Sequence, residues 1–140
     1  MASAAIPIAI VSARGRPKTA GTAWPDWSDV RIAIAGKGGT GKTTIAGTLA
    51  RLIARRGREV WAIDADSNPN LAVTLGVPRE AHAGLTPVPR TILRDDPSDE
   101  TGKRKVLGVP AADVIARYAY RGPDAVRLLL MGRVDHAGAG

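Results

Sequence analysis

The 140-residue chain is long enough for one folded domain and leaves little room for a second. It contains no cysteine, which excludes disulfides and cysteine-based metal sites within this sequence and makes the cytoplasm the expected location. Its net charge of +7 is spread along the chain, so we expect only weak attraction to polyanions and no specific nucleic-acid partner. No apolar run approaches the roughly 18 to 20 residues needed to cross a bilayer, so no membrane segment is expected.

The N-terminal residues differ in composition from the rest of the chain. The stretch 12–29 is rich in Gly, Pro, Ala and Thr and has no clear period, which favours a mobile segment. Trp24 and Trp27 lie in this stretch; loose packing on the domain is the simpler interpretation, and recognition of a partner is the alternative. We therefore predict a flexible N-terminal extension over residues 1–28, with the folded domain over residues 29–140.

The chain changes character after this extension. The apolar run 30–36 is typical of a buried parallel strand, residues 42–56 have the period of an amphipathic helix, and residues 59–64 predict a second strand. Arginines crowd the end of the helix, where positive charge suits the helix dipole; a solvated helix end is a simpler interpretation than nucleic-acid contact. The predicted apolar face of the helix comprises Ile45, Leu49, Leu52 and Ile53.

A loop rich in glycine and lysine lies between the first strand and the helix. Its sequence, GKGGTGKTT (36–44), contains the phosphate-loop pattern G-x-x-x-x-G-K-[ST], in which glycines let backbone N–H groups curl around a phosphate. Lys42 is expected to reach the β- and γ-phosphates, Thr43 to coordinate Mg²⁺ and Thr44 to contact the α-phosphate. A glycine-rich turn with a surface lysine is the alternative. The predicted nucleotide-binding residues are Gly36, Lys37, Gly38, Gly39, Thr40, Gly41, Lys42, Thr43 and Thr44.

The second half of the chain carries fewer signals. The stretch 95–105 combines an acidic and a basic run with Pro and Gly, so a solvated loop is expected there. Residues 109–120 predict a helix, and residues 125–132 predict another buried strand.

The order of these elements predicts an α/β fold: a phosphate-loop NTPase with a parallel, Rossmann-like sheet sandwiched between helices. Residues 30–140 supply about three strands, whereas sheets of this kind usually have about five or more. We therefore expect residues 29–140 to be the N-terminal part of a phosphate-loop ATPase domain that is incomplete at its C-terminus.

The loop also resembles a particular family. KGGTGKT (37–43) is similar to the variant phosphate loop of the family that includes MinD and ParA partition ATPases, arsenite-pump ATPases, nitrogenase iron protein and nickel-insertion ATPases. AIDADSNPNLAVTLGV (62–77) looks like the first switch segment of that family. The closest resemblance is to the CooC group of nickel-insertion ATPases, and residues 34–77 and 128–140 carry it.

The resemblance assigns catalytic roles to three residues. It implies that Lys42 serves the chain's own nucleotide, while Lys37 reaches the partner's phosphates across an ATP-dependent homodimer. A positively charged side chain next to the transferred phosphoryl group stabilises the negative charge of the transition state and so favours the transfer. Asp66 would orient the attacking water, directly or through the water shell of Mg²⁺.

The switch segment departs from the family pattern. Ser67 replaces the usual proline and Pro69 follows two residues later, which leaves the path of the loop open. Asp64 is the second candidate for the catalytic role of Asp66; alternatively it holds the strand end or waters of the Mg²⁺ shell. Capping of the next helix by Asp66, Ser67 or Asn68 is a further interpretation of these polar residues.

The resemblance implies an ATP-binding and ATP-hydrolysing dimerisation switch, a metallochaperone that docks on a client metalloenzyme. Its cofactors would be ATP and Mg²⁺. A MinD- or ParA-like positioning or partition ATPase is the alternative enzyme. A truncated, non-catalytic nucleotide-binding fragment is the alternative from outside the enzymes.

Overall fold

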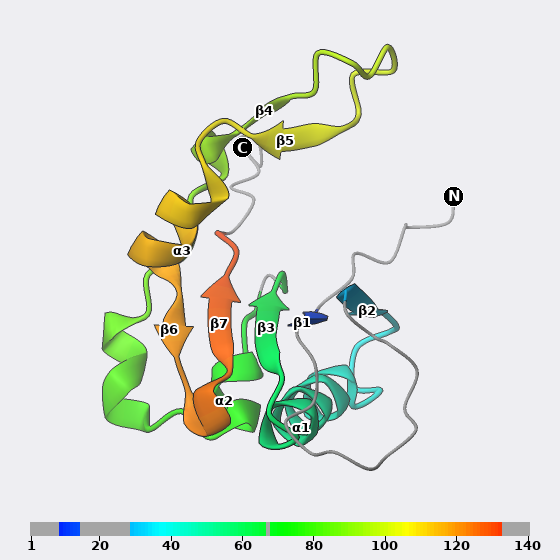
Figure 1. The fold of residues 1–140 in the computed structure, drawn as a ribbon. Coiled ribbons are helices and arrows are strands. Elements are labelled where there is room, and N and C mark those ends of the chain that lie inside the picture. Colours follow the sequence, from blue (N-terminus) through cyan, green and yellow to red (C-terminus); the bar gives the residue numbers. More distant parts are fainter. Residues whose placement is uncertain (1–8, 15–28, 67, 133–140) are drawn as a thin grey trace, which may run out of the picture.

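The computed structural model describes residues 9–14, 29–66 and 68–132, which form an α/β structure (Figure 1). In chain order the elements are β1 (Ala9–Arg14), β2 (Asp29–Ile34), α1 (Lys42–Arg55), β3 (Glu59–Asp64), α2 (Leu71–Leu75), η1 (Arg79–Gly84), η2 (Arg90–Ile92), β4 (Leu93–Asp95), β5 (Lys105–Leu107), α3 (Ala111–Tyr118), β6 (Tyr120–Arg121), η3 (Pro123–Ala125) and β7 (Arg127–Leu130), where η marks a 3-10 helix. The predicted order of strand, helix, strand, helix and strand is confirmed by β2, α1, β3, α3 and β7.

The main sheet has the strand order β2-β1-β3-β7-β6. β3 and β7 pair in parallel, whereas β1 is antiparallel to both β2 and β3, and β6 is antiparallel to β7. Because β2 and β3 both run against β1, they run in the same direction, as the two strands flanking a helical crossover should. The predicted α/β class is confirmed, and the sheet is mixed because β1 and β6 oppose the other three strands.

The position of β1 corrects one prediction. This strand comes from the predicted extension, yet it lies inside the sheet and pairs with β2 on one side and with β3 on the other. The prediction that residues 1–28 form a flexible extension is therefore wrong for residues 9–14. Residues 1–8 and 15–28, which include Trp24 and Trp27, lie outside the described part of the chain. Backbone pairing with two neighbouring strands satisfies the N–H and C=O groups of this segment, and its own short sequence gives no sign of that.

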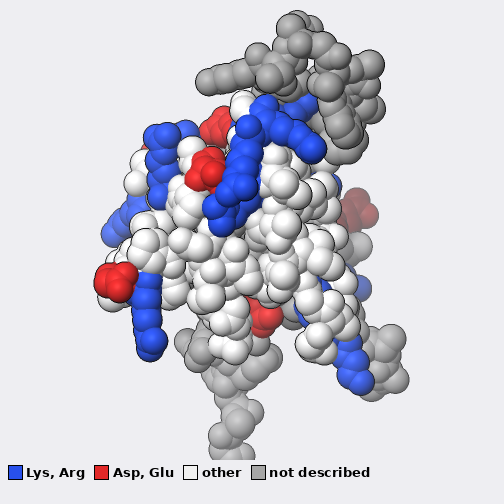
Figure 2. Space-filling model, turned by 90° about the horizontal axis from the view of Figure 1, so that it is seen from below, with Lys and Arg blue, Asp and Glu red and all other residues white. Residues whose placement is uncertain are grey.

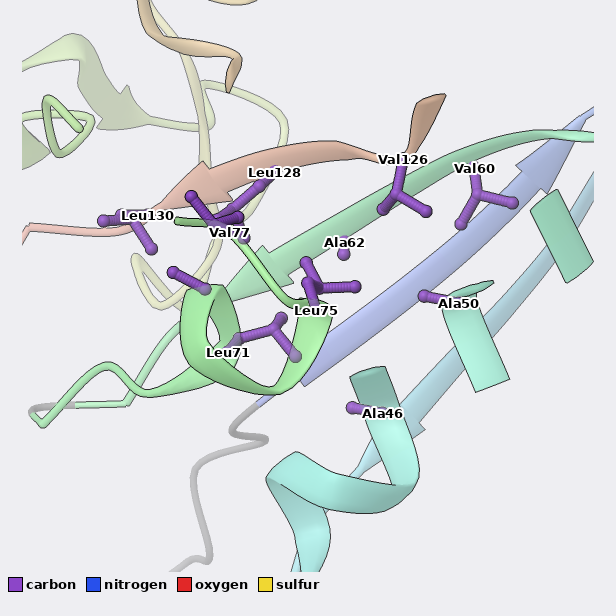
Figure 3. Packing of buried hydrophobic residues seen from close by; sticks show 11 residues of the cluster. Ala46, Ala50, Val60, Ala62, Leu71, Leu75, Val77, Val126, Leu128 and Leu130 are labelled. Atoms are coloured by element: carbon purple, nitrogen blue, oxygen red, sulfur yellow. The ribbon is translucent and has the colours of Figure 1, made fainter. Parts of the chain in front are cut away.

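The main core lies between one face of the sheet and the helices α1 and α2 (Figure 3). Leu71 and Leu75 of α2 and Val60 of β3 are fully buried there. The fully buried side chains that α1 contributes to this core are small, Ala46 and Ala50, while Ile53 packs against it partly buried. Its neighbours can therefore lie close to the α1 backbone.

The predicted apolar face of α1 is wrong at two positions. Ile45 is 56% exposed and Leu52 is 46% exposed, while Ala46, Gly47 and Ala50 face the core. A Cβ atom on Gly47 would lie 2.7 Å from the Thr74 hydroxyl oxygen and 3.1 Å from the Thr74 carbonyl carbon. The close approach of α2 thus selects the face with the smallest side chains, because larger ones do not fit there.

A second apolar cluster covers the other face of the sheet. Val88, Val114 of α3 and Leu129 of β7 are buried in it, and Trp61 and Ile63 of β3 pack against them. The segment 95–105, which was predicted to be a loop, connects the two strands of the short antiparallel hairpin β4–β5. The protein therefore has helices or loops on both faces of β3 and β7, which is the expected sandwich arrangement.

An ion-pair network fixes the C-terminal half of α1 to the turn before β7. The Asp124 carboxylate accepts hydrogen bonds from Arg51 at 2.7 Å and from Arg55 at 3.1 Å. Asp124 and Ala125 both have positive φ values, 54° and 60°. Seen from below the view of Figure 1, the surface carries basic side chains close to acidic ones (Figure 2). The network holds a turn whose backbone is costly for residues with a Cβ atom.

Candidate phosphate-binding site

The phosphate loop leaves the carboxyl end of β2 and enters α1. Gly39 and Gly41 have φ values of 79° and 78°, which only glycine adopts without strain, and Gly41 is the N-cap of α1. The first turn of a helix has backbone N–H groups without a helical partner, and the helix dipole adds partial positive charge there. The local backbone therefore has the form expected for binding a phosphate.

Lys42 closes the loop on itself. Its side chain is only 7% exposed, and its ammonium donates a 2.6 Å hydrogen bond to the carbonyl oxygen of Lys37. The Thr40 hydroxyl donates to the same oxygen at 2.9 Å. A Cβ atom on Gly36 would lie 3.2 Å from that hydroxyl and 3.6 Å from Cδ of Lys42, so glycine makes room for both side chains. The Lys42 ammonium is thus held inside the loop, next to the amides of the first helical turn.

The remaining loop residues are more accessible. Lys37 and Thr44 are exposed, and Thr43 is half-buried at the start of α1. The Lys37 side chain is therefore open to a partner, while its main chain takes part in the internal contacts of the loop.

Asp64 ends β3 and is buried, with 1% of its surface exposed. Its Oδ2 accepts the N–H of Leu71 at 2.9 Å, and its Oδ1 accepts the N–H of Asp66 at 3.1 Å. Burial raises the pKa of the Asp64 carboxyl above its ordinary value, because the charged form loses solvation, although these amide donors act in the opposite direction. A helix-capping contact therefore exists in this segment, but the carboxylate that accepts the amide of Leu71 belongs to Asp64 rather than to Asp66.

Asp66 is half-buried, and its Oδ1 accepts the N–H of Asn68 at 3.0 Å. This bond, from the amide two residues further on, is the one that defines an Asx turn. Ser67, where the family pattern has proline, lies outside the described residues.

The sheet brings the two groups of residues to the same edge. Ile34, the last residue of β2, and Asp64, the last residue of β3, both pair with Ala9 of β1. The two strand ends are therefore level and two strand spacings apart, about 10 Å. Lys37, Thr40 and Lys42 form one contact group and Asp64 and Asp66 a second, with the width of β1 between their strands.

Sequence reasoning missed two contacts that shape this site. The Thr40 hydroxyl shares the Lys37 carbonyl with Lys42, and the carboxylate of Asp64 reaches the amide of Leu71. A hydroxyl residue inside the phosphate loop was a visible signal for the first. The contact between Asp64 and the amide of Leu71 joins residues seven positions apart, and no local sequence pattern predicts it.

The described residues offer oxygen donors that suit Mg²⁺, namely the Thr43 hydroxyl and the carboxylates of Asp64 and Asp66. Within the described ranges, no three His, Asp or Glu side chains gather into a metal-binding group. In proteins Mg²⁺ is usually bound by one or two carboxylates together with substrate phosphates. Of the helices described, none combines the length and apolar character needed to span a bilayer.

Comparison with known proteins identifies the family. The model of the CobQ/CobB/MinD/ParA nucleotide binding domain, CbiA, matches residues 32–132. The carbon monoxide dehydrogenase accessory protein CooC of Rhodospirillum rubrum is 42% identical over 115 residues, which cover 79% of this chain and 43% of the relative. An uncharacterized ATP-binding protein of Methanocaldococcus jannaschii is 35% identical over 118 residues, with the same two coverages of 79% and 43%.

A more distant relative, ATPase BagA of Mycobacterium tuberculosis, is 31% identical over 97 residues, 68% of this chain and 26% of the relative. No solved structure matches the chain significantly. The chain spans less than half the length of these relatives. The family match begins within β2 and ends just after β7, so it includes the phosphate loop, α1 and both carboxylates at the end of β3. The chain belongs to the CobQ/CobB/MinD/ParA family of nucleotide-binding domains.

Proposed function

We propose that the chain binds Mg-ATP at residues 36–44 and is part of an ATPase that dimerises around its nucleotide and assists the maturation of a metalloenzyme, of the nickel-insertion type. The observation that carries the proposal is the buried Lys42, whose ammonium is held by a carbonyl oxygen inside a glycine loop at a helix N-terminus. Similarity to an accessory protein of carbon monoxide dehydrogenase supports the metalloenzyme client.

Nucleotide binding would begin with a change of the hydrogen-bond acceptor of the Lys42 ammonium. A bound phosphate would replace the Lys37 carbonyl oxygen as acceptor, so a neutral hydrogen-bond acceptor gives way to an anionic one. A hydrogen bond to a charged group contributes about 1.5–3 kcal/mol, so Lys42→Ala should weaken Mg-ATP binding by about tenfold to a hundredfold. Calorimetry measures this, with Lys103→Ala in the exposed loop as the matched control. Equal ATP affinity in Lys42→Ala and parent would refute the proposal.

The exposed Lys37 supports a role across a dimer. Its side chain is open to a partner, and in a nucleotide-bound dimer it would add positive charge to the neighbour's phosphates. Lys37→Ala should keep the ATP affinity of the monomer and weaken dimerisation with a non-hydrolysable ATP analogue, measured by sedimentation. A variant that dimerises and hydrolyses ATP like the parent would exclude this role.

Asp66 is the proposed residue for orienting the attacking water. Its carboxylate lies in the loop that follows β3, at the sheet edge where the phosphate loop begins. Bound Mg²⁺ would neutralise charge on the phosphates, with Thr43 as its direct protein ligand and Asp64 as a candidate for holding one of its waters. Asp66→Asn should leave ATP binding unchanged and slow phosphate release.

Turnover is a separate question from binding, because the chain spans 43% of CooC. Phosphate release should be measured on the purified chain beside the binding experiments. Lys42-dependent binding without turnover would favour the nucleotide-binding, non-catalytic alternative over the ATPase.

A further inference from the structure

Asp64, at the end of β3, is a charged residue that is almost completely buried. Among the described residues, Lys42 and Asp64 are the charged side chains that are buried. Burying a carboxylate costs free energy unless hydrogen bonds replace its water. For Asp64 the donors are backbone amides of the chain that follows it, so its burial and the path of this segment depend on each other.

The main chain of Asp64 is fixed by the sheet. It pairs with Ala9 on one side and with Leu130 on the other, and its carbonyl oxygen accepts the N–H of Met131 at 2.8 Å. A side chain that starts from such a fixed backbone can hold a loop in a defined place. The sheet therefore fixes the Asp64 end of its contacts with the amides of Asp66 and Leu71.

The start of α2 receives its capping bond from Asp64. The helix α2 has five residues, and its N-cap residue, Asn70, makes no side-chain capping bond. Asp64 supplies that bond instead, through Oδ2 to the amide of Leu71, and its Oδ1 holds the amide of Asp66. The two bonds tie the amides of Asp66 and Leu71 to the same carboxylate.

We propose that Asp64 is a positioning residue for Asp66: through its bonds to the amides of Asp66 and Leu71, it sets where the Asp66 carboxylate stands relative to the nucleotide. This inference rests on the proposed role of Asp66 in hydrolysis. It differs from the predicted role of Asp64 as a holder of magnesium-bound water, because positioning acts through the loop and needs no contact with the Mg²⁺ shell. The two roles give different results when Mg²⁺ is titrated.

The first test needs no variant. In the parent chain the Leu71 amide should exchange its hydrogen at least about tenfold more slowly than the Ala112 amide, which also lies in the first turn of a helix. A hydrogen bond to a charged acceptor is strong enough for a difference of this size. Equal exchange rates would overturn the proposal, and the result does not depend on whether the chain hydrolyses ATP.

The second test uses Asp64→Asn, with the exposed Asp113→Asn as the matched control. An Asn amide can accept one of the two N–H groups, but its own N–H₂ faces the other. We expect ATP affinity within about threefold of the parent, hydrolysis slower by about tenfold or more, and an unchanged Mg²⁺ concentration for half-maximal rate. Exchange at Leu71 or Asp66 should become at least about tenfold faster.

Two outcomes of this test contradict positioning. A Mg²⁺ requirement raised about tenfold or more would assign Asp64 to the metal's water shell, and unchanged exchange at both amides would show that it does not hold the loop. If Asp64→Asn does not fold, Asp64→Glu replaces it, because it keeps the charge and displaces the oxygens by one methylene. It should show the same faster exchange, and parent-like exchange together with parent-like hydrolysis would overturn the proposal.

Discussion

The closest contact between α1 and α2 predicts the effect of one methyl group. In Gly47→Ala the new Cβ atom would lie 2.7 Å from Oγ1, 3.0 Å from Cβ and 3.1 Å from the backbone carbon of Thr74. The hydroxyl can rotate away, but the backbone carbon moves only if α2 shifts. Overpacking of this kind costs about 1–3 kcal/mol, while alanine in place of glycine in a helix returns about 1 kcal/mol. The free energy of unfolding should therefore fall, by up to about 2 kcal/mol.

Urea denaturation of parent and variant measures this difference. Gly84→Ala is the control, because a Cβ atom on Gly84 meets nothing within 4 Å, and its unfolding free energy should stay within about 0.5 kcal/mol of the parent. The double variant Gly47→Ala/Thr74→Ala should lose less than the sum of its single variants, because the nearest clashing atom is gone. A Gly47→Ala protein that is more stable than the parent, as helix propensity alone predicts, would refute the packing argument.

Three further predictions concern other parts of the structure. Ala125→Gly should raise the unfolding free energy by about 0.5–1 kcal/mol, because its left-handed backbone is costly only for a residue with a Cβ atom; a lower urea midpoint would contradict this. Hydrogen bonds from the two arginines of α1 lower the pKa of Asp124 below 3.8 in the folded state, so its ionised form stabilises the fold above pH 3.8 and this contribution is lost as the pH falls through the lowered pKa. The difference in melting temperature between parent and Asp124→Asn should thus be full at neutral pH and vanish in acid, and a difference independent of pH would exclude the ion-pair explanation. Leu52→Gln should change the unfolding free energy by less than about 0.5 kcal/mol and reduce self-association in light scattering, since Leu52 is 46% exposed; a loss typical of a core residue would place it in the interior.

Local pattern was sufficient to predict the elements around the phosphate loop. β2, α1 and β3 follow from an apolar run, a helical period and a second apolar run, and the loop between the first two follows from glycine and lysine spacing. β1 could not be predicted in this way. Its stability comes from pairing with two strands that are distant in sequence, while the glycines and prolines after it favour disorder.

The buried face of α1 shows why periodicity alone was insufficient. Ile45 and Leu52 have the spacing of a core face, but Ala46 and Ala50 also have a helical spacing, on another face of the helix. The choice between these faces depends on how closely α2 and the sheet approach, and that distance is a property of the neighbours. An apolar period therefore identified the helix without identifying the side that is buried.

In the candidate site, too, features set by local sequence were predictable and features set by distant contacts were not. The form of the phosphate loop was predictable because it is a stretch of nine residues whose conformation is largely set by its glycines. The role of Asp64 was left open at the sequence level, because the loop after it has Ser67 and Pro69 in unusual places. Only the path of that loop decides which amides the carboxylate can reach.

The position of β1 has a practical consequence for anyone who shortens this chain. In the described part of the sheet β2 is an edge strand, and β1 is its one neighbour. The family match starts at residue 32, so cloning boundaries drawn from that match would delete β1 and the first half of β2. Such a truncation keeps every residue of the nucleotide motif but removes the hydrogen bonds that attach its strand to the rest of the sheet. Loss of ATP binding in that shorter protein would report a detached strand and would say nothing about the chemistry of the loop.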